Sequence, residues 1–136
     1  MYKIFDEFLK ENNFQLRTEI VDGNKFYAVD EDIDGNMITI LVSVEQANIY
    51  HSVSVRLVRN IVSEKKQEYI KLANTTNLQY KNLCCTIGED NHFDVSSYYI
   101  ASEQTFDPKL LITIISSFIK VLKNGLLEEA LRIKYR

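Results

Sequence analysis

The sequence predicts a single α+β domain in which helices cover one face of an antiparallel sheet. Three observations lead to this fold class. Apolar residues recur at every second position between residues 14 and 58 and again between 83 and 101, whereas both ends of the chain carry them at helical spacing. Short turn sequences separate the alternating segments. A chain of 136 residues also suits one domain that buries its own core without disulfides or metal.

The first half is predicted to form a helix over about Tyr2–Asn12 and then a four-stranded meander. The four strands are expected at residues 14–20, 25–33, 37–44 and 49–58. Asp22-Gly23-Asn24 and Asp34-Gly35 are turn sequences, and the second is a strong hairpin signal.

The turns predict the register of the meander. We expect two-residue loops at Gly23-Asn24 and Asp34-Gly35 and a four-residue loop at 45–48. These loops pair Ile20 with Tyr27, Tyr27 with Val42, and Ile40 with Val53. Apolar residues then share one face, which a shift by one residue would scatter. The residues expected to face the helices are Ile20, Tyr27, Val29, Ile40, Val42, Val53 and Val55. The same register places Arg17 opposite Asp30 on the outer face.

The second half is predicted to be a helix, a hairpin and one or two final helices. The helix spans about Ser63–Asn77, with Ser63 as its N-cap. Strands at 83–87 and 92–101 enclose a turn at residues 88–91. Asp107 caps the last helix, Pro108 occupies its first position, and Asn124-Gly125 is expected to kink or divide it before Leu126–Tyr135. The order of the strands in the sheet is left open.

Charge and hydropathy exclude several classes of protein. A net charge of −3 argues against a nucleic-acid binder. Residues 1–47 carry −6 and residues 48–136 carry +3, which fits either a solvated acidic hairpin or two faces suited to association. The acids within the first apolar segment argue against a signal peptide, and Leu110–Leu122 is too short and too interrupted to span a membrane. The sequence therefore predicts a cytoplasmic protein that binds neither nucleic acid nor membrane.

No motif in the sequence indicates catalysis, a cofactor or a metal. Asp30-x-Asp32-x-Asp34-Gly35 begins like a calcium loop, but Leu41 stands where the bidentate Glu belongs. His51 is expected to be a buried structural residue, and His92 lies at a hairpin. The adjacent Cys84 and Cys85 cannot form an ordinary disulfide, and we expect one buried and one half-exposed thiol in a reducing compartment.

The predicted outer face of the meander carries a small apolar strip with a polar rim. Its members are Val21, Phe26, Ala28, Leu41 and Tyr50. Phe26 is expected beside Val21 and Ser43, with Tyr50 also next to Ser43. This composition is typical of an interaction surface, although scattered surface hydrophobes would look alike. The apolar side of the last helix, around Leu110–Leu122, is a second candidate for the interaction.

The element order, with Leu72-Ala73-Asn74-Thr75-Thr76-Asn77 at the end of the middle helix, resembles the YbjN-like family of bacterial proteins. More remotely it is similar to the chaperones of type III secretion systems. The resemblance implies a non-enzymatic cytosolic protein that dimerises or binds a partner chain, and it transfers no catalytic residue. The extra fourth strand and the break at Gly125 depart from the family pattern. Asn74 and Asn77 themselves are expected to cap the end of their helix.

Three functional hypotheses follow. The first is a protein-interaction module that binds a partner polypeptide or itself. The second is an immunity or antitoxin-type protein whose acidic half sequesters a basic effector. The third, from a different class, is a small-molecule-binding protein or hydrolytic enzyme, which a deep pocket with His51 or His92 near a carboxylate would indicate.

Overall fold

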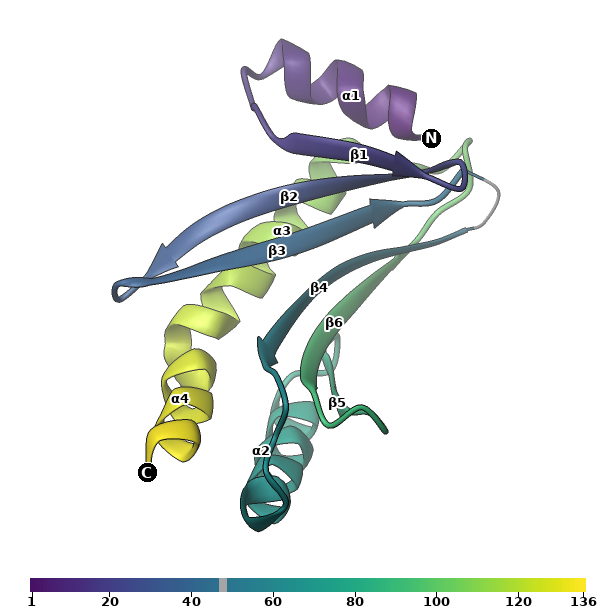
Figure 1. Cartoon of the computed structure of the whole chain (residues 1–136). Helices are drawn as coiled ribbons and strands as arrows, with labels where there is room; N and C mark the ends of the chain where they lie inside the picture. Colours follow the sequence, from purple (N-terminus) through teal and green to yellow (C-terminus); the bar gives the residue numbers. More distant parts are fainter. Residues whose placement is uncertain (47–48) are drawn as a thin grey trace.

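The computed structural model describes residues 1–46 and 49–136 and has the predicted α+β fold, with a six-stranded sheet and helices (Figure 1). The strands are β1 Arg17–Val21, β2 Asn24–Ile33, β3 Asn36–Val44, β4 Tyr50–Val58, β5 Cys84–Ile87 and β6 Phe93–Ile100. All neighbours are antiparallel, and the spatial order is β1-β2-β3-β4-β6-β5. The helices are α1 Tyr2–Glu11, α2 Lys66–Gln79, α3 Pro108–Val121 and α4 Leu127–Tyr135.

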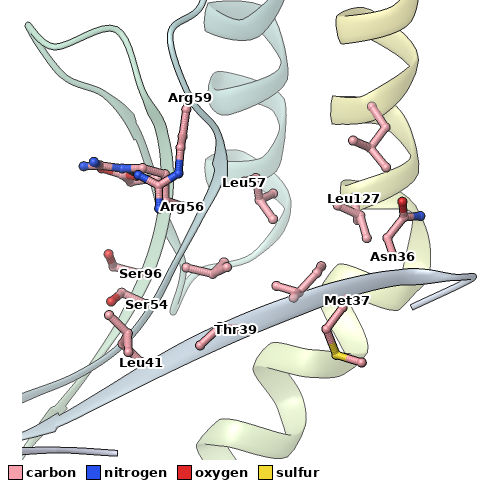
Figure 2. A pocket seen from close by; sticks show the side chains of 14 residues that line it. Asn36, Met37, Thr39, Leu41, Ser54, Arg56, Leu57, Arg59, Ser96 and Leu127 are labelled. Carbon is pink, nitrogen blue, oxygen red and sulfur yellow. Dashed lines mark hydrogen bonds and ion pairs between the residues drawn. The ribbon is translucent and has the colours of Figure 1, made fainter. Parts of the chain in front are cut away.

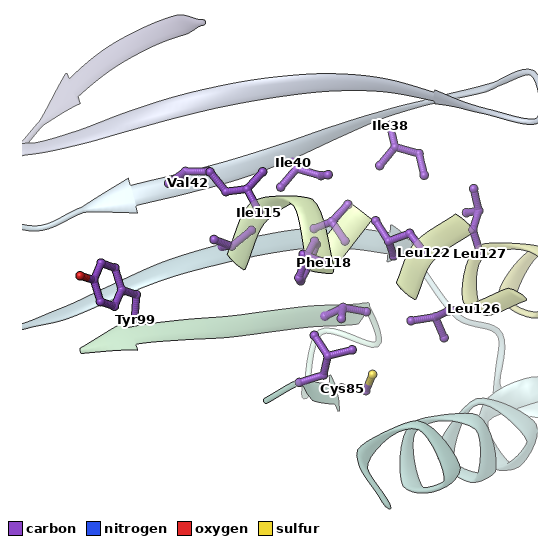
Figure 3. Packing of buried hydrophobic residues seen from close by; sticks show 14 of the residues in the cluster. Ile38, Ile40, Val42, Cys85, Tyr99, Ile115, Phe118, Leu122, Leu126 and Leu127 are labelled. Atoms are coloured by element: carbon purple, nitrogen blue, oxygen red, sulfur yellow. The ribbon is translucent and has the colours of Figure 1, made fainter. Parts of the chain in front are cut away.

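The helices pack on one face of the sheet, which makes the fold a two-layer arrangement. Phe5 of α1 meets Tyr27 of β2 edge to face, with ring centroids 4.9 Å apart. Tyr69 of α2 lies against Phe93 of β6 at 5.7 Å. Helix α3 crosses beneath the sheet, so that Phe118 lies between side chains of β3 and side chains of β5 and β6 (Figure 3). The core therefore lies between the helices and one face of all the central strands.

Five of the seven predicted inner positions are buried, and the other two lie toward the edge of the sheet. Tyr27, Ile40, Val42, Val53 and Val55 are at most 5% exposed, and Val29 is half-buried. Ile20 pairs with Lys25 and so lies on the same face, but it is 59% exposed. Every residue of β1 is exposed, because this strand lies at the edge of the sheet.

The predicted register is confirmed in the second hairpin and wrong by two residues in the other two. Tyr27 pairs with Val42 and Val29 with Ile40, as expected. Tyr27 faces Thr18 instead of Ile20, however, and Val53 faces Val42 instead of Ile40. A shift by two residues keeps every side chain on its face, because the side-chain period of a strand is two.

The first of these shifts has a cause in the turn. Asp22 and Gly23 have φ angles of 52° and 81°, so they form the two-residue loop in place of Gly23-Asn24. Hairpin turns that match the strand twist need positive φ at both central residues. The expected loop at 45–48 lies partly outside the described residues, and Val44 and Tyr50 bound the connection between β3 and β4.

Several element boundaries differ from the prediction because a local hydrogen bond decides them. Phe14 donates its backbone N–H to the carbonyl of Leu9 at 2.9 Å and closes the end of α1, so β1 begins only at Arg17. Ser63 opens a 3₁₀ turn, Ser63–Lys65 (η1), and does not cap α2 with its side chain. Asp107 does cap α3, since its carboxylate accepts from the backbone N–H of Lys109 at 3.0 Å.

The final helix is interrupted where the sequence predicts it. Leu122–Leu126 (η2) connects α3 to α4 across a kink, where Asn124 and Gly125 leave helical geometry and Gly125 has a φ of 112°. By length and composition alone, the helical stretch Pro108–Tyr135 could cross a membrane, but the core helix of a soluble protein meets the same criterion. Leu111, Ile115, Phe118 and Leu122 of this stretch are buried in the core.

Candidate functional site

The outer face of the sheet, which points away from the helices, carries all five residues of the predicted apolar strip. Val21, Leu41 and Tyr50 are 44%, 46% and 52% exposed. Phe26 and Ala28 are half-buried. Alternation places them there, because their neighbours in sequence point into the core.

The neighbours of these five residues differ from the prediction. Ala28 lies beside Leu41, as expected. Phe26 lies between Glu19 and Ser43 and not beside Val21, as a consequence of the shifted first hairpin. Ser43 faces Ser52, so Tyr50 is not next to it.

Strand β6 adds two large side chains to the outer face that sequence reasoning missed. Tyr50 pairs with Ile100, and Tyr98 is the next outward residue of β6. Tyr98 and Ile100 are 59% and 61% exposed. The alternation of residues 93–101 marks them as outward, but only the pairing of β4 with β6 brings them beside Tyr50.

The outer face thus holds two apolar groups, which we call the β1–β3 patch and the β4–β6 patch. The β1–β3 patch consists of Val21, Phe26, Ala28 and Leu41, and the β4–β6 patch consists of Tyr50, Tyr98 and Ile100. Four half-buried serines lie between the two patches: Ser43, Ser52, Ser54 and Ser96. Small side chains between larger ones make the middle of the face lower than its two sides.

Ion pairs flank the patches. Arg17 reaches Asp30 at 2.8 Å, as predicted, but diagonally, because Arg17 stands opposite Ala28. A hydrogen bond from Thr39 and the nearby Arg17 guanidinium lower the pKa of Asp30. On the other side of the face, Arg56 donates to both carboxylate oxygens of Asp94, at 2.8 and 3.1 Å. The carboxylates of Asp30 and Asp94 therefore already have arginine partners within the chain.

A cleft opens in the outer face where β3 and β4 separate (Figure 2). Among the described residues, the two strands pair only at Leu41–Ser54, Val42–Val53 and Ser43–Ser52. Beyond these pairs the cleft has a volume of about 680 Å³. Arg56 and Arg59 line its β4 side and Asn36, Met37 and Thr39 its β3 side, while Leu127 and Leu131 of α4 form its floor.

Neither histidine lines this cleft, although His92 lies 3.6 Å from Asp90, which is itself 3.5 Å from Arg56. His51 is fully buried, as expected. Its Nδ1 accepts from the backbone N–H of Glu45 at 3.1 Å, and its Nε2 donates to the carbonyl of Ala101 at 3.0 Å. Burial lowers the pKa of His51. His92 accepts from the backbone N–H of Asn60 at 3.1 Å, in the loop before α2.

The cysteines and the aspartate run also have structural partners. Cys84 is exposed and Cys85 is buried, and burial raises the pKa of the Cys85 thiol to about 11. Asp32 accepts from the backbone N–H of Gly35 at 2.9 Å and so stabilises the hairpin turn. Within residues 1–46 and 49–136, no group of three or more His, Cys, Asp and Glu side chains is placed to hold a metal ion.

Asn77 of the Asn-x-x-Asn segment has a role that differs from the expected helix cap. Its side-chain oxygen accepts from the N–H of Cys85 at 2.6 Å, and its amide nitrogen donates to the carbonyl of the same residue at 3.0 Å. Helix α2 ends instead at Tyr80, whose N–H bonds to the carbonyl of Thr76. Asn77 thus holds the edge strand β5 against α2, and Asn74 is exposed.

Comparison with known proteins does not assign the chain to a family. No protein-family model matches it, and no curated protein sequence matches it either. The resemblance to the YbjN-like family therefore stays a prediction.

Proposed function

We propose that this protein is a non-enzymatic interaction module that binds a partner polypeptide through the outer face of its sheet. The observation that carries the proposal is the exposure of Tyr98 and Ile100, 59% and 61%, on a sheet face that the helices leave open. Sheet faces in stable monomers are usually covered or polar, whereas large apolar side chains with a polar rim are typical of binding surfaces. Tyrosine in particular is enriched at interfaces.

The surroundings of the titratable residues favour binding over catalysis. Both ring nitrogens of His51 are engaged with the backbone, and the ring is closed off from solvent. The Cys85 thiol is buried with a raised pKa, which disfavours the nucleophilic thiolate. The cleft between β3 and β4 holds two arginines and an aspartate that is paired with one of them. His92 lies 3.6 Å from Asp90, but neither of these residues lines that cleft.

A cytosolic location forms part of the proposal. Cys84 and Cys85 are both free thiols. Free thiols persist in reducing compartments, where disulfides are rare.

The proposal is tested by photocrosslinking from the outer face. A photoreactive amino acid at position 98, in cells that express the protein, should crosslink to another polypeptide. The same group at position 78, where Leu78 is 86% exposed on α2, should not. The crosslinked polypeptide, once purified, should bind wild type and Leu78→Asp alike, and should bind Tyr98→Asp and Phe26→Asp about tenfold more weakly.

Two other outcomes are informative. If position 98 crosslinks only to a second copy of this chain, and Tyr98→Asp converts a dimer to a monomer in sedimentation experiments, the partner is the protein itself. If position 98 gives no adduct and the wild type is monomeric, the outer face is not a binding surface and the proposal is wrong.

A further inference from the structure

The sheet is split between β3 and β4, and the split leaves backbone edges without a strand partner. Antiparallel pairing continued from Val42–Val53 would join Thr39 to Arg56. Instead, residues 36–40 pair only with β2 and residues 55–58 only with β6, within the described part of the chain. Figure 1 shows the two strands diverging toward the end of β2 and the start of β6. Backbone N–H and C=O groups at such edges need water or another chain as partners.

The divergence has a local cause in β4. Arg56 pairs with Asp94 and Val58 with Phe93, so Leu57 is an extra residue in a β-bulge. A bulge bends its strand and increases the local twist, which turns β4 away from β3. Strand β3 keeps an uninterrupted register with β2 along its whole length. The edge of β3 is therefore the more regular template for an added strand.

Behind these edges the cleft has an apolar floor. Ile38, Val55 and Leu127 are 8%, 5% and 4% exposed, and Leu57 and Leu131 are half-buried. An added strand on β3 would point every second side chain toward this floor. Aliphatic side chains are the ones that such a floor accommodates.

Two arginines, Arg56 and Arg59, line the β4 side of the cleft. Arg56 lies next to Asp94 and, at 3.5 Å, next to Asp90, which balance its charge. Arg59 lines the cleft and is exposed, and it has no ion pair among residues 1–46 and 49–136. A guanidinium without a carboxylate partner is suited to bind an anionic group in hydrogen-bonded geometry.

We infer that the cleft binds an extended segment of the partner in which aliphatic residues alternate with at least one acidic residue. The segment pairs with the edge of β3 at residues 36–40, buries its aliphatic side chains against Leu127 and Leu131, and places its carboxylate by Arg59. The inference rests on the proposed function, because it specifies the chemistry of the partner. It adds that the open sheet is completed by a strand from another chain.

The test selects peptides on the purified full-length protein from a displayed library of random 12-residue sequences. Enriched peptides should alternate aliphatic and acidic residues. The chain contains no tryptophan, so a tryptophan added to a synthetic peptide reports binding by its fluorescence alone. Arg59→Glu should weaken binding about tenfold or more, and a peptide with Lys in place of its acid should bind Arg59→Glu better than wild type. Lys71→Glu, an equal change in net charge on the exposed side of α2, should keep the wild-type affinity.

The backbone contacts have their own readout. N-methylation of alternate peptide amides should abolish binding, because it removes the donors that pair with β3. Amides of residues 36–40 that exchange quickly in the free protein should become protected when the peptide is bound. Binding that survives both Arg59→Glu and N-methylation would overturn the inference. The inference would also be overturned if the NMR chemical shifts of residues 36–40 change when decanoate is added but do not change with any selected peptide. The ligand would then be a small anionic amphiphile.

The two proposals can fail separately. If the library gives no binder, or only binders that Tyr98→Asp weakens and Arg59→Glu does not, the cleft does not bind a strand but the outer face still binds a partner. If position 98 gives no crosslink while a selected peptide protects residues 36–40, the cleft binds a peptide and the β4–β6 patch has no part in it.

Discussion

At the scale of single residues, His51 shows how burial fixes a protonation state. The carbonyl of Ala101 can only accept and the N–H of Glu45 can only donate, so the ring must carry its proton on Nε2 alone. Tyr99 and Phe106 surround it, with ring centroids 6.0 and 5.4 Å away. A second proton on Nδ1 would face the N–H of Glu45 and break that hydrogen bond. The side chain of His51, in β4, thus connects the residue that follows β3 with the residue that follows β6.

This arrangement predicts a loss of stability in mild acid. Burial lowers the pKa of His51 from its ordinary value of 6.5, whereas the carboxylate of Glu45 opposes the shift and the N-terminal amino group adds to it. The unfolded chain then binds a proton that the folded chain does not, so the contribution is complete above pH 6.5 and is lost as the pH falls toward the folded-state pKa. Urea unfolding at pH 5, 6, 7 and 8 measures it. His51→Gln should flatten the slope between pH 7 and pH 5, at a cost of about 1–3 kcal/mol at pH 7.

The other histidine provides the control. His92→Gln replaces a half-buried histidine in the loop before β6 and shows whether the pH dependence is specific to His51. An unchanged slope in His51→Gln would assign the pH dependence to carboxylates instead.

At the scale of elements, the two edge strands of the sheet are kept from pairing with another chain in different ways. Strand β1 is exposed along its length and carries Arg17 and Glu19 among its apolar residues, and charges of this kind discourage pairing with another chain. Strand β5 is covered by α2, where the side-chain amide of Asn77 occupies both backbone groups of Cys85. An amide can imitate one residue of a neighbouring strand because it has one donor and one acceptor in a plane.

The contact between α2 and β5 is predicted to depend on both atoms of that amide. Asn77→Asp keeps the acceptor for the N–H of Cys85 but turns the donor into an oxygen that faces the Cys85 carbonyl. We expect a loss of about 1–3 kcal/mol in the free energy of unfolding, from a lost hydrogen bond and an unsatisfied carbonyl. Asn74→Ala changes the other asparagine of the pair, which is exposed, and should stay within about 0.5 kcal/mol of wild type. Equal effects of the two substitutions in thermal or urea unfolding would contradict the assignment.

The break between α3 and α4 is also a property of elements. Gly125 adopts a φ of 112°, which glycine reaches without a steric penalty. The turn redirects the chain so that α4 lies under the cleft, where Leu127 and Leu131 form its floor. A straight helix would continue along the line of α3 and leave the cleft without this floor.

At the scale of the whole molecule, one core spans both halves of the split sheet. The halves are β1–β3 and β4 with β6 and β5. In the part of the chain that the structure describes, three residue pairs of the sheet join them. Helix α3 crosses beneath both, and Phe118, 2% exposed, packs between them (Figure 3). The hydrophobic layer, more than the sheet itself, therefore holds the halves together.

This arrangement predicts that the halves unfold together. Phe118→Ala should lower the free energy of unfolding by about 3–5 kcal/mol, the usual cost of removing a buried phenylalanine. In native-state hydrogen exchange, the free energies of opening measured at the amides of Tyr27 in β2 and Val95 in β6 should fall by the same amount, because both amides depend on the shared core. Ser116→Ala, on the exposed side of α3, should change neither by more than about 0.5 kcal/mol. If the free energy of opening falls for the amides of only one half, the halves are separate folding units.

Local signals in the sequence were enough to predict the fold class, the faces of the meander and the break at Gly125. These features depend on local signals: a period of two, turn residues with positive φ, and a glycine inside a helical segment. They were sufficient to place Val21, Phe26, Ala28, Leu41 and Tyr50 on the outer face. The ion pair of Arg17 with Asp30 forms even though the register is displaced, because long side chains reach diagonal neighbours.

The assembly of those faces depends on contacts between residues that are distant in the sequence. Val53 pairs with Ser97, far along the chain, and no local signal specifies that contact. It brings Tyr98 and Ile100 to the outer face beside Tyr50. The cleft likewise arises from the bulge at Leu57 and the position of α4, and both depend on how the helices pack beneath the sheet. Strand order and splitting follow from the packing of the whole core, because a period-two pattern states which side of a strand is buried but not which strand lies next to it.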